Sequence, residues 1–215
     1  MKMKKGGVRK VSAKSIREAG KIVLGGGVIV YPTDTVYGLG CDPMNELAAE
    51  RLFTIKGRGG KPVPVLCDSF ESASRLVRLS GVALRLAKEY WPGALTIVLP
   101  LRMELPELIH QGSGTLAVRV PNSRRCLELI SACGGYLIGT SANKSGKPAC
   151  RTAHEALRSI GEEVDLILDG GRLSEKESTV VKVSGNRVEL LRSVELSESE
   201  WLRVEEAAVL SALRT

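Results

Sequence analysis

The side chains best suited to chemistry follow a β-branched run at residues 28–30, which predicts a buried strand because such residues pack well in sheets. Pro32 ends this run. Hydroxyl and carboxylate groups then follow in quick succession, at Thr33, Asp34, Thr35 and Tyr37. Polar groups clustered at a strand end are typical of a binding site. The alternative is a turn in which the Thr and Asp side chains bond local amides.

A second candidate is the cationic, glycine-rich segment at residues 56–62, K-G-R-G-G-K-P. Glycines expose backbone N–H groups, Arg58 can fork onto phosphate oxygens, and Lys56 and Lys61 supply point charges. The order of residues differs from that of a Walker A loop. The segment therefore indicates either a polyanion-binding loop or a solvated basic loop.

Two further segments carry polar groups at predicted strand ends. Ser141 and Asn143 can hold a purine edge or a phosphate, or can cap a helix or form an Asx-turn. Arg119 lies within an apolar strand, where a buried guanidinium needs a carboxylate or phosphate partner from the protein or a ligand, unless it faces water. Neither His110 nor His154 has a catalytic context, so a mechanism with a histidine base is not expected.

Hydrophobic periodicity and capping residues place these groups on alternating helices and strands. Helices are expected near 16–23, where Ser15 and Glu18 have capping-box spacing, over 46–56, where Asn45 can be the cap, after Ser69 and Ser80, and over 123–133, 151–160 and 198–213. Strands are expected at 28–31, 63–67, 95–99, 115–120, 136–140, 164–168, 179–183 and 187–191, with 100–114 as a loop. This alternation predicts an α/β fold with a mixed sheet, whose strand ends are the usual place for a ligand.

The composition excludes several classes of protein. No apolar run approaches the ~20 residues that span a bilayer, and no secretory signal is evident, so we expect an intracellular, soluble protein. The chain has 5 Cys without a C-x-x-C pair and 2 His, which predicts buried reduced thiols and no structural zinc site. The net charge of +7 is compatible with RNA binding, although aromatic residues make up 4% of the chain.

Six ordered motifs give the chain a resemblance to a known family: Y-P-T-D-T-V-Y-G-L-G at 31–40, K-G-R at 56–58, W-P-G-A-L-T at 91–96, A-V-R-V-P at 117–121, T-S-A-N-K-S-G at 140–146 and S-T-V at 178–180. Over about residues 12–192 the chain resembles the YrdC-like threonylcarbamoyl-adenylate synthases of the single-domain type. The resemblance implies a twisted, open α/β sheet with a concave basic face. It also implies one domain over 1–215, in which 193–215 form a C-terminal helical extension.

The implied reaction joins L-threonine, bicarbonate and ATP into L-threonylcarbamoyl-AMP and pyrophosphate, with Mg²⁺ accompanying ATP. The product would serve the t6A modification of ANN-decoding tRNAs through a partner threonylcarbamoyl transferase in the cytoplasm. Two alternatives remain: a non-catalytic module that binds tRNA, rRNA or other double-stranded RNA on the same basic face, and carbamoyl transfer during metallocentre maturation.

The resemblance assigns roles to residues that match the motifs. Lys56 and Arg58 would be catalytic, and the ATP-binding residues would be Arg58, Lys61, Thr115, Ser141, Asn143 and Arg192. Threonine would contact Thr35, Arg119, Ser178 and the backbone of Gly139. Support would come from Thr33, Asp34, Tyr37 and Thr140, and no protein side chain is assigned to the metal.

The chain departs from the family pattern at three places. Gly59 stands where a proline often follows the K-x-R arginine, and the loop to Lys61 is one residue short. Leu66 or Cys67 occupies the position of a histidine that contacts threonine in many members. The usual Arg-Pro-Gly near the end reads Arg-Ser-Val from Arg192.

Overall fold

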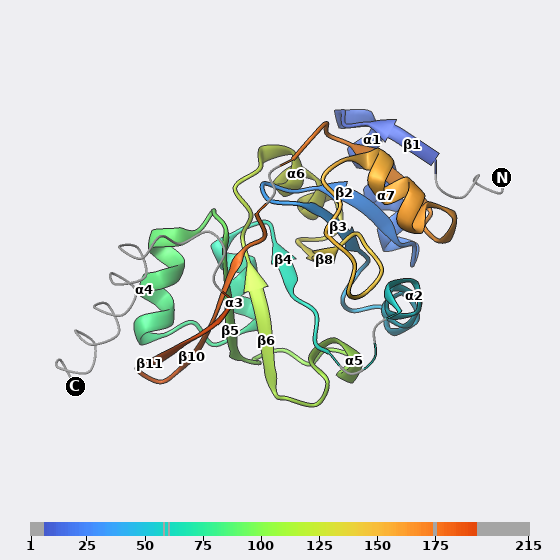
Figure 1. The fold of residues 1–215 in the computed structure, drawn as a ribbon. Helices are drawn as coiled ribbons and strands as arrows, with labels where there is room; N and C mark the ends of the chain where they lie inside the picture. Colours follow the sequence, from blue (N-terminus) through green and yellow to red (C-terminus); the bar gives the residue numbers. More distant parts are fainter. Residues whose placement is uncertain (1–6, 58, 60, 174–175, 193–215) are drawn as a thin grey trace.

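The computed structural model describes residues 7–57, 59, 61–173 and 176–192 (Figure 1). Its strands are β1 (Gly7–Lys10), β2 (Ile29–Pro32), β3 (Tyr37–Gly40), β4 (Val65–Cys67), β5 (Leu95–Pro100), β6 (Thr115–Arg119), β7 (Tyr136–Ile138), β8 (Thr140–Ser141), β9 (Leu166–Asp169), β10 (Thr179–Ser184) and β11 (Arg187–Arg192). Its helices are α1 (Ala13–Leu24), α2 (Glu46–Lys56), α3 (Phe70–Leu76), α4 (Gly81–Tyr90), α5 (Glu107–His110), α6 (Arg124–Ala132), α7 (Ala153–Ile160) and the 3₁₀ turn η1 (Gly161–Glu163). The predicted extension at 193–215 and Arg58 lie outside the described residues.

The strands form two mixed sheets. One has the order β1-β9-β2-β3-β8, and the other has the order β11-β10-β5-β6-β4-β7. Each contains both parallel and antiparallel pairs: β2 pairs parallel with β9 and antiparallel with β3, and β6 pairs parallel with β4 and antiparallel with β5. The predicted α/β fold with mixed pairing is confirmed, and the backbone hydrogen bonds divide the strands into two sheets.

The helix starts follow from short polar side chains. Asn45 caps α2 and Ser69 caps α3, as the sequence predicts. The predicted N-terminal cap of α1 was wrong. Its cap is Ser12, whose Oγ accepts from the N–H of Ser15 while the Ser15 Oγ accepts from the N–H of Ser12. Ser15 occupies the third helical position, where a capping box usually has an acidic residue. The helix therefore begins earlier in the chain than the Ser15–Glu18 spacing predicts.

The sequence patterns missed the strands β1 and β3 and the short helix α5. β1 is a largely exposed edge strand, and its polar residues give no apolar alternation. β3 contains two glycines, yet it pairs antiparallel with β2 through Pro32 and Tyr37, so residues 33–36 form the turn of a hairpin. α5 is a single helical turn inside the segment expected to be a loop. The hairpin turn brings the Thr-Asp-Thr cluster to the end of β2.

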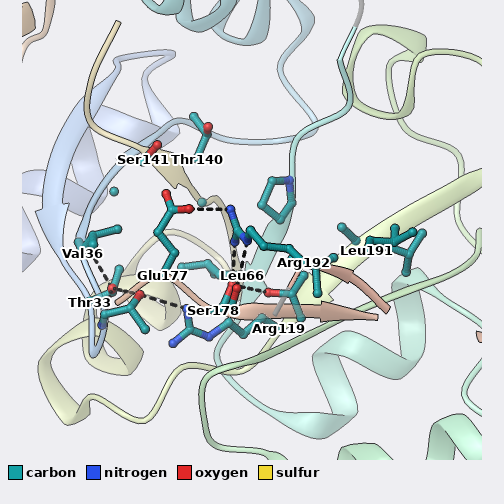
Figure 2. A pocket seen from close by; sticks show the side chains of 18 of the residues that line it. Thr33, Val36, Leu66, Arg119, Thr140, Ser141, Glu177, Ser178, Leu191 and Arg192 are labelled. Carbon is teal, nitrogen blue, oxygen red and sulfur yellow. Dashed lines mark hydrogen bonds and ion pairs between the residues drawn. The ribbon is translucent and has the colours of Figure 1, made fainter. Parts of the chain in front are cut away.

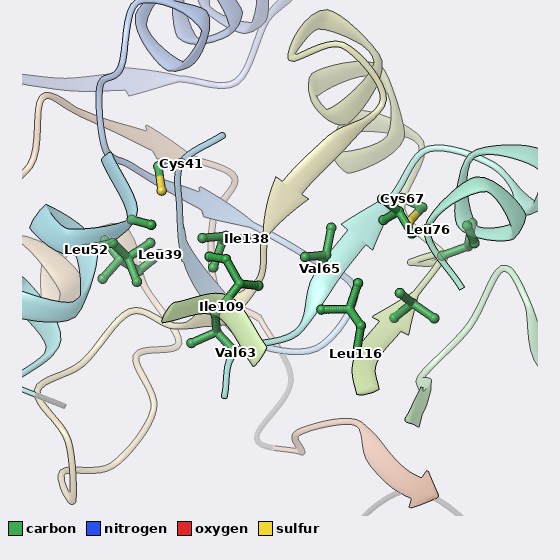
Figure 3. Close-up of a cluster of buried hydrophobic side chains, with 14 of the residues drawn as sticks. Leu39, Cys41, Leu52, Val63, Val65, Cys67, Leu76, Ile109, Leu116 and Ile138 are labelled. Atoms are coloured by element: carbon green, nitrogen blue, oxygen red, sulfur yellow. The ribbon is translucent and has the colours of Figure 1, made fainter. Parts of the chain in front are cut away.

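Two hydrophobic clusters hold the sheets and helices together. The larger contains Leu39, Leu52, Val65, Ile109 and Ile138 among others, and Figure 3 shows these side chains meeting between the elements. The smaller lies under α1 and α6. Val28 and Val30 belong to the larger cluster and Ile29 and Tyr31 to the smaller. This segment is therefore buried on both faces, which explains its continuous apolar run.

Side chains alternate across the six-stranded sheet. Leu95, Ile97, Leu116 and Val118 face the larger cluster with residues of α3 and α4 such as Leu76 and Leu86. The intervening residues Thr96, Val98, Ala117 and Arg119 point to the other face, which these helices leave uncovered. This uncovered face forms the floor of the pocket described below. Within the described residues, no helix combines the length and the apolar character needed to cross a membrane.

The five cysteines are free and buried. Burial raises the pKa of the Cys41 and Cys133 thiols to about 12 and raises the pKa of Cys67, Cys126 and Cys150 as well, since a thiolate is poorly solvated in an apolar interior. We therefore expect the folded protein to resist iodoacetamide at about pH 8, where free thiols react. Mass spectrometry should find labelled cysteines only after unfolding in guanidinium chloride. Rapid labelling of any cysteine in the folded protein would contradict the described burial.

Candidate functional site

A pocket of ≈ 330 Å³ lies where the two sheets meet. Its floor is the uncovered face of β5, β6 and β10, and its walls come from the β2–β3 turn, β4, β8 and the segment 62–64 (Figure 2). The lining residues are Thr33, Thr35, Val36, Tyr37, Gly38, Pro62, Pro64, Leu66, Thr96, Val98, Ala117, Arg119, Gly139, Thr140, Ser141, Glu177, Ser178, Val180, Leu191 and Arg192. The pocket therefore combines apolar walls with a few polar groups, as small-molecule sites do.

Arg119 ends β6 and is the most constrained charge in the pocket. Its Nη2 lies 2.6 Å from Oδ1 of Asp34, its Nε donates to the carbonyl oxygen of Gly93 at 2.7 Å, and its Nη1 donates to Oγ1 of Thr35 at 3.2 Å. The side chains of Arg119 and Asp34 are 5% and 13% exposed. Asp34 also accepts the N–H of Asn122 at 2.9 Å. Since a guanidinium carries five N–H groups, these contacts do not use all of its donors, although Nη2 itself is buried.

The Thr-Asp-Thr turn is built to hold two hydroxyls at the pocket. Thr33 Oγ1 donates to the carbonyl oxygen of Val36 at 2.7 Å and accepts the N–H of Thr35 at 3.0 Å. It also lies 3.1 Å from Thr35 Oγ1. The sequence left the roles of Thr33 and Asp34 open. In the structure Thr33 orients Thr35, and Asp34 holds Arg119.

Ser178 and Arg192 meet on the opposite side of the pocket. The hydroxyls of Ser178 and Thr96 are 2.9 Å apart. Arg192 donates through Nε to the carbonyl oxygen of Ser178 at 3.0 Å and through Nη2 to its Oγ at 3.2 Å. Nη1 of Arg192 pairs with Glu177 at 2.8 Å. Figure 2 shows Glu177, Ser178 and Arg192 with the hydrogen bonds and the ion pair that join them.

Lys56 lies behind Ser141 and Asn143. Its Nζ donates to the carbonyl oxygen and Oγ of Ser141 at 2.5 and 3.0 Å and to Oδ1 of Asn143 at 2.9 Å. The Asn143 amide in turn donates to the carbonyl oxygens of Lys144 and Lys147. Lys56 is 3% exposed. The ammonium group thus fixes the loop after β8 and contacts the pocket through Ser141.

Gly139 and Leu66 form a close contact in the pocket wall. A Cβ at Gly139 would lie 2.5 Å from Cγ of Leu66, so a larger residue would push Leu66 out of place. Leu66 pairs with Arg119 across β4 and β6 and lines the pocket, whereas Cys67 faces the larger hydrophobic cluster. The pocket-facing position of the expected family histidine is therefore an apolar leucine.

Most of the predicted site residues converge on this pocket. Those that line it are Thr33, Thr35, Tyr37, Arg119, Gly139, Thr140, Ser141, Ser178 and Arg192. Lys56, Asn143 and Asp34 contact lining residues from behind. Thr115 bonds Ser113 near the start of β6, beyond the lining residues, and Lys61 is exposed beside Pro62. The ligand assignments of all these residues stay predictions.

Tyr37 supports the pocket from its edge. Its hydroxyl donates to the carbonyl oxygen of Gly171 at 2.7 Å and accepts the N–H of Gly170 at 3.0 Å. Burial is the main cause that raises the pKa of Tyr37, so the phenol stays protonated near neutral pH and can donate. The ring thus ties β3 to the chain after β9.

Sequence reasoning missed Thr96, Glu177 and the carbonyl oxygen of Gly93. Thr96 alternates with core residues along β5, which is a signal that the strand pattern contained. Gly93 belongs to the W-P-G motif, and a Cβ there would lie 2.2 Å from the carbonyl oxygen of Tyr90. Glu177 precedes a strand in a polar segment and carried no distinguishing signal.

A divalent cation would find few protein ligands here. Across the described ranges, no three His, Cys, Asp or Glu side chains are grouped to hold a metal ion. Glu177 is the one carboxylate among the described residues that line the pocket, and Arg192 already pairs with it. These donors suit a cation that arrives with a phosphorylated ligand better than a cage of carboxylates.

Comparisons with known proteins agree with the geometry. The family model of Sua5, YciO and YrdC, described as "Telomere recombination", matches residues 21–193. A threonylcarbamoyl-AMP synthase of Nitrosococcus oceani is 38% identical over 157 residues, which cover 72% of this chain and 85% of that protein. The Pyrococcus abyssi synthase is 37% identical over 172 residues, which cover 79% of this chain and 51% of that protein. The chain thus spans about half the length of the second relative.

Solved structures show the same fold. A crystal structure of P. abyssi Sua5 complexed with L-threonine has a TM-score of 0.86 at 35% identity and covers 92% of this chain and 59% of that one. The structure of Escherichia coli YciO has a TM-score of 0.80 at 30% identity and covers 89% and 95% of the two chains. The chain thus spans about three fifths of the length of P. abyssi Sua5.

The buried pair of Asp34 and Arg119 gives a stability prediction. Asp34→Ala should lower the free energy of unfolding by about 3–5 kcal/mol, because it leaves a buried guanidinium without its counter-charge. Glu163→Ala is the matched control, since it breaks the Lys144–Glu163 pair, whose side chains are 40% and 41% exposed. The control should cost less than about 1 kcal/mol. Urea denaturation followed by circular dichroism measures both, and equal losses would refute the special role of Asp34.

Proposed function

The chain belongs to the Sua5/YciO/YrdC family, and on this basis we propose that it is a threonylcarbamoyl-AMP synthase. It would use L-threonine, bicarbonate and MgATP and release pyrophosphate. The observation that carries the proposal is one pocket that joins a buried arginine and hydroxyls to a lysine-supported polar loop. The buried arginine and the hydroxyls suit a small amino acid, and the polar loop suits a nucleotide.

The amino acid would bind at the floor of the pocket. Arg119 lines the pocket, and the second N–H of its Nη1 would donate a charge-assisted hydrogen bond to the carboxylate. Thr35 and Ser178 supply hydroxyls from the two sheets, and the Gly139 backbone completes the wall. Leu66 lies beside Arg119 and would contact the amino-acid side chain through apolar atoms.

The nucleotide would bind along the loop after β8. Ser141 lines the pocket there, and Lys56 holds both Ser141 and Asn143 in place. Arg192 offers a guanidinium at the opposite wall. Arg58 and Lys61 belong to the glycine-rich segment 56–62, whose Pro62 lines the pocket, and would reach the phosphates. Mg²⁺ would enter with ATP and neutralise phosphate charge.

The chemistry requires positioning more than a protein base. The threonine amine attacks CO₂ derived from bicarbonate and forms a carbamate. A carbamate oxygen then attacks the α-phosphorus in line, and the bond to the leaving pyrophosphate breaks. Cations and oriented N–H groups stabilise the charge that develops in such a step. The absence of a histidine in a catalytic context is therefore no obstacle.

The later fate of the product follows from its chemistry. A threonylcarbamoyl adenylate is an activated acyl donor, which a further enzyme can use. By the family resemblance, a partner transferase would pass its acyl group to ANN-decoding tRNAs as the t6A modification. We place this exchange in the cytoplasm, where ATP and tRNA are both available. The alternative of an RNA-binding module is not favoured, because a pocket of ≈ 330 Å³ that combines apolar walls with a few polar groups suits small molecules.

An assay of pyrophosphate release tests the proposal. The purified chain should release pyrophosphate only when MgATP, bicarbonate and threonine are all present, and mass spectrometry should detect the adenylate. Arg58→Ala should lower kcat by roughly 10²–10³-fold, as the loss of one charge-stabilising donor does in other enzymes. Arg124→Ala, on α6 and 89% exposed, is the control and should retain activity. Pyrophosphate release without threonine, or no adenylate from the unaltered protein, would refute the proposal.

A further inference from the structure

Two arginines line the pocket, and each is paired with a carboxylate in a different way. The Arg119–Asp34 pair is buried, and Asp34 is itself held by the Asn122 N–H. The Arg192–Glu177 pair is more open, with side chains that are 42% and 33% exposed. Apart from Arg192, none of the described residues donates a hydrogen bond to the Glu177 carboxylate.

The two members of the open pair differ in how firmly they are held. Arg192 ends β11, and its Nε and Nη2 both bond Ser178 across the β10–β11 ladder. Glu177 precedes β10 and meets Arg192 through one oxygen at 2.8 Å. Partly exposed ion pairs of this kind are weak, because water competes for both charges. The carboxylate can therefore leave while the guanidinium stays in place.

We propose that Glu177 is an internal competitor for Arg192, and that an incoming phosphate group of the nucleotide displaces it. The inference rests on the proposed function, because it requires a nucleotide in this pocket. The phosphate takes the position of the Glu177 oxygen at Nη1 of Arg192, and the carboxylate turns toward solvent. If the Glu177 carboxylate stayed beside the bound phosphate, the two negative charges would repel each other. Glu177 thus lowers nucleotide affinity and leaves amino-acid binding at Arg119 unchanged.

The geometry favours competition over metal binding by Glu177. A cation bound to this carboxylate would lie next to the guanidinium of Arg192, which repels it. No second carboxylate among the described lining residues completes a cation site. The two roles predict opposite effects when the charge is removed: competition predicts tighter nucleotide binding, and metal ligation predicts weaker binding of MgATP.

Glu177→Gln tests the inference because it removes the charge and keeps the shape of the side chain. With a non-hydrolysable ATP analogue and Mg²⁺, isothermal titration calorimetry should show a Kd about two- to fivefold lower than that of the unaltered protein. The gain should shrink at high salt, which screens exposed charges. The Kd of L-threonine should not change. If Glu177 had only a structural role, its replacement would not tighten nucleotide binding while it leaves threonine binding unchanged.

Two further variants isolate the contact. Glu128→Gln on α6 is the matched control, because Glu128 also pairs with an arginine, Arg125, at 2.8 Å and is 34% exposed. It should leave the nucleotide Kd unchanged. In an Arg192→Ala background, Glu177→Gln should lose its gain, since the double-mutant cycle then lacks the arginine for which the two anions compete.

The outcomes separate this inference from the proposed function. If the unaltered protein binds the nucleotide and Glu177→Gln binds it equally or more weakly, the competition is refuted and the synthase proposal stands. A gain that persists in the Arg192→Ala background also refutes it. If the unaltered protein binds neither nucleotide nor threonine, the proposed function fails and this inference fails with it.

Discussion

The structure of the pocket depends on the burial of one guanidinium. Arg119 is 4% exposed, and a charge at such a position must be compensated within the protein. Its partners come from two separate segments: Asp34 and Thr35 from the hairpin turn, and the carbonyl oxygen of Gly93 from the chain before β5. The five-stranded sheet carries the turn, and the six-stranded sheet carries Arg119. The charge therefore ties the two sheets together at the place where the ligand would bind.

The requirement for compensation also explains why distant motifs belong to one site. The W-P-G segment supplies no side chain to the pocket, but Gly93 accepts from Arg119 and donates its N–H to the carbonyl oxygen of Val120. The T-S-A-N loop is held by Lys56 at the end of α2, whose ammonium group bonds both Ser141 and Asn143. In each case a backbone or buried group determines where a pocket-facing side chain lies.

The sequence predicts those parts of this arrangement that depend on local patterns. The β-branched run before Pro32, the caps at Asn45 and Ser69 and the strand at 115–120 are local signals, and the structure confirms them. β1 and the capping box at Ser12 were missed because their residues lack an apolar period or the usual acidic N3 residue. The pairing of Asp34 with Arg119 joins residues far apart in the chain. A single sequence shows that Arg119 needs a partner, but the fold determines which carboxylate that is.

The charge balance of the pocket gives its two ends different properties. At the Arg119 end the carboxylate is 13% exposed and bonded to the backbone of Asn122, so this end keeps its geometry whether or not a ligand is bound. At the Arg192 end the carboxylate is 33% exposed and held by its arginine alone among the described residues, so water and ligands can reach it. A rigid end suits a small amino acid, which must present its amine in one orientation. An adjustable end suits a flexible, highly charged chain of phosphates, because local charge can rearrange as the ligand enters.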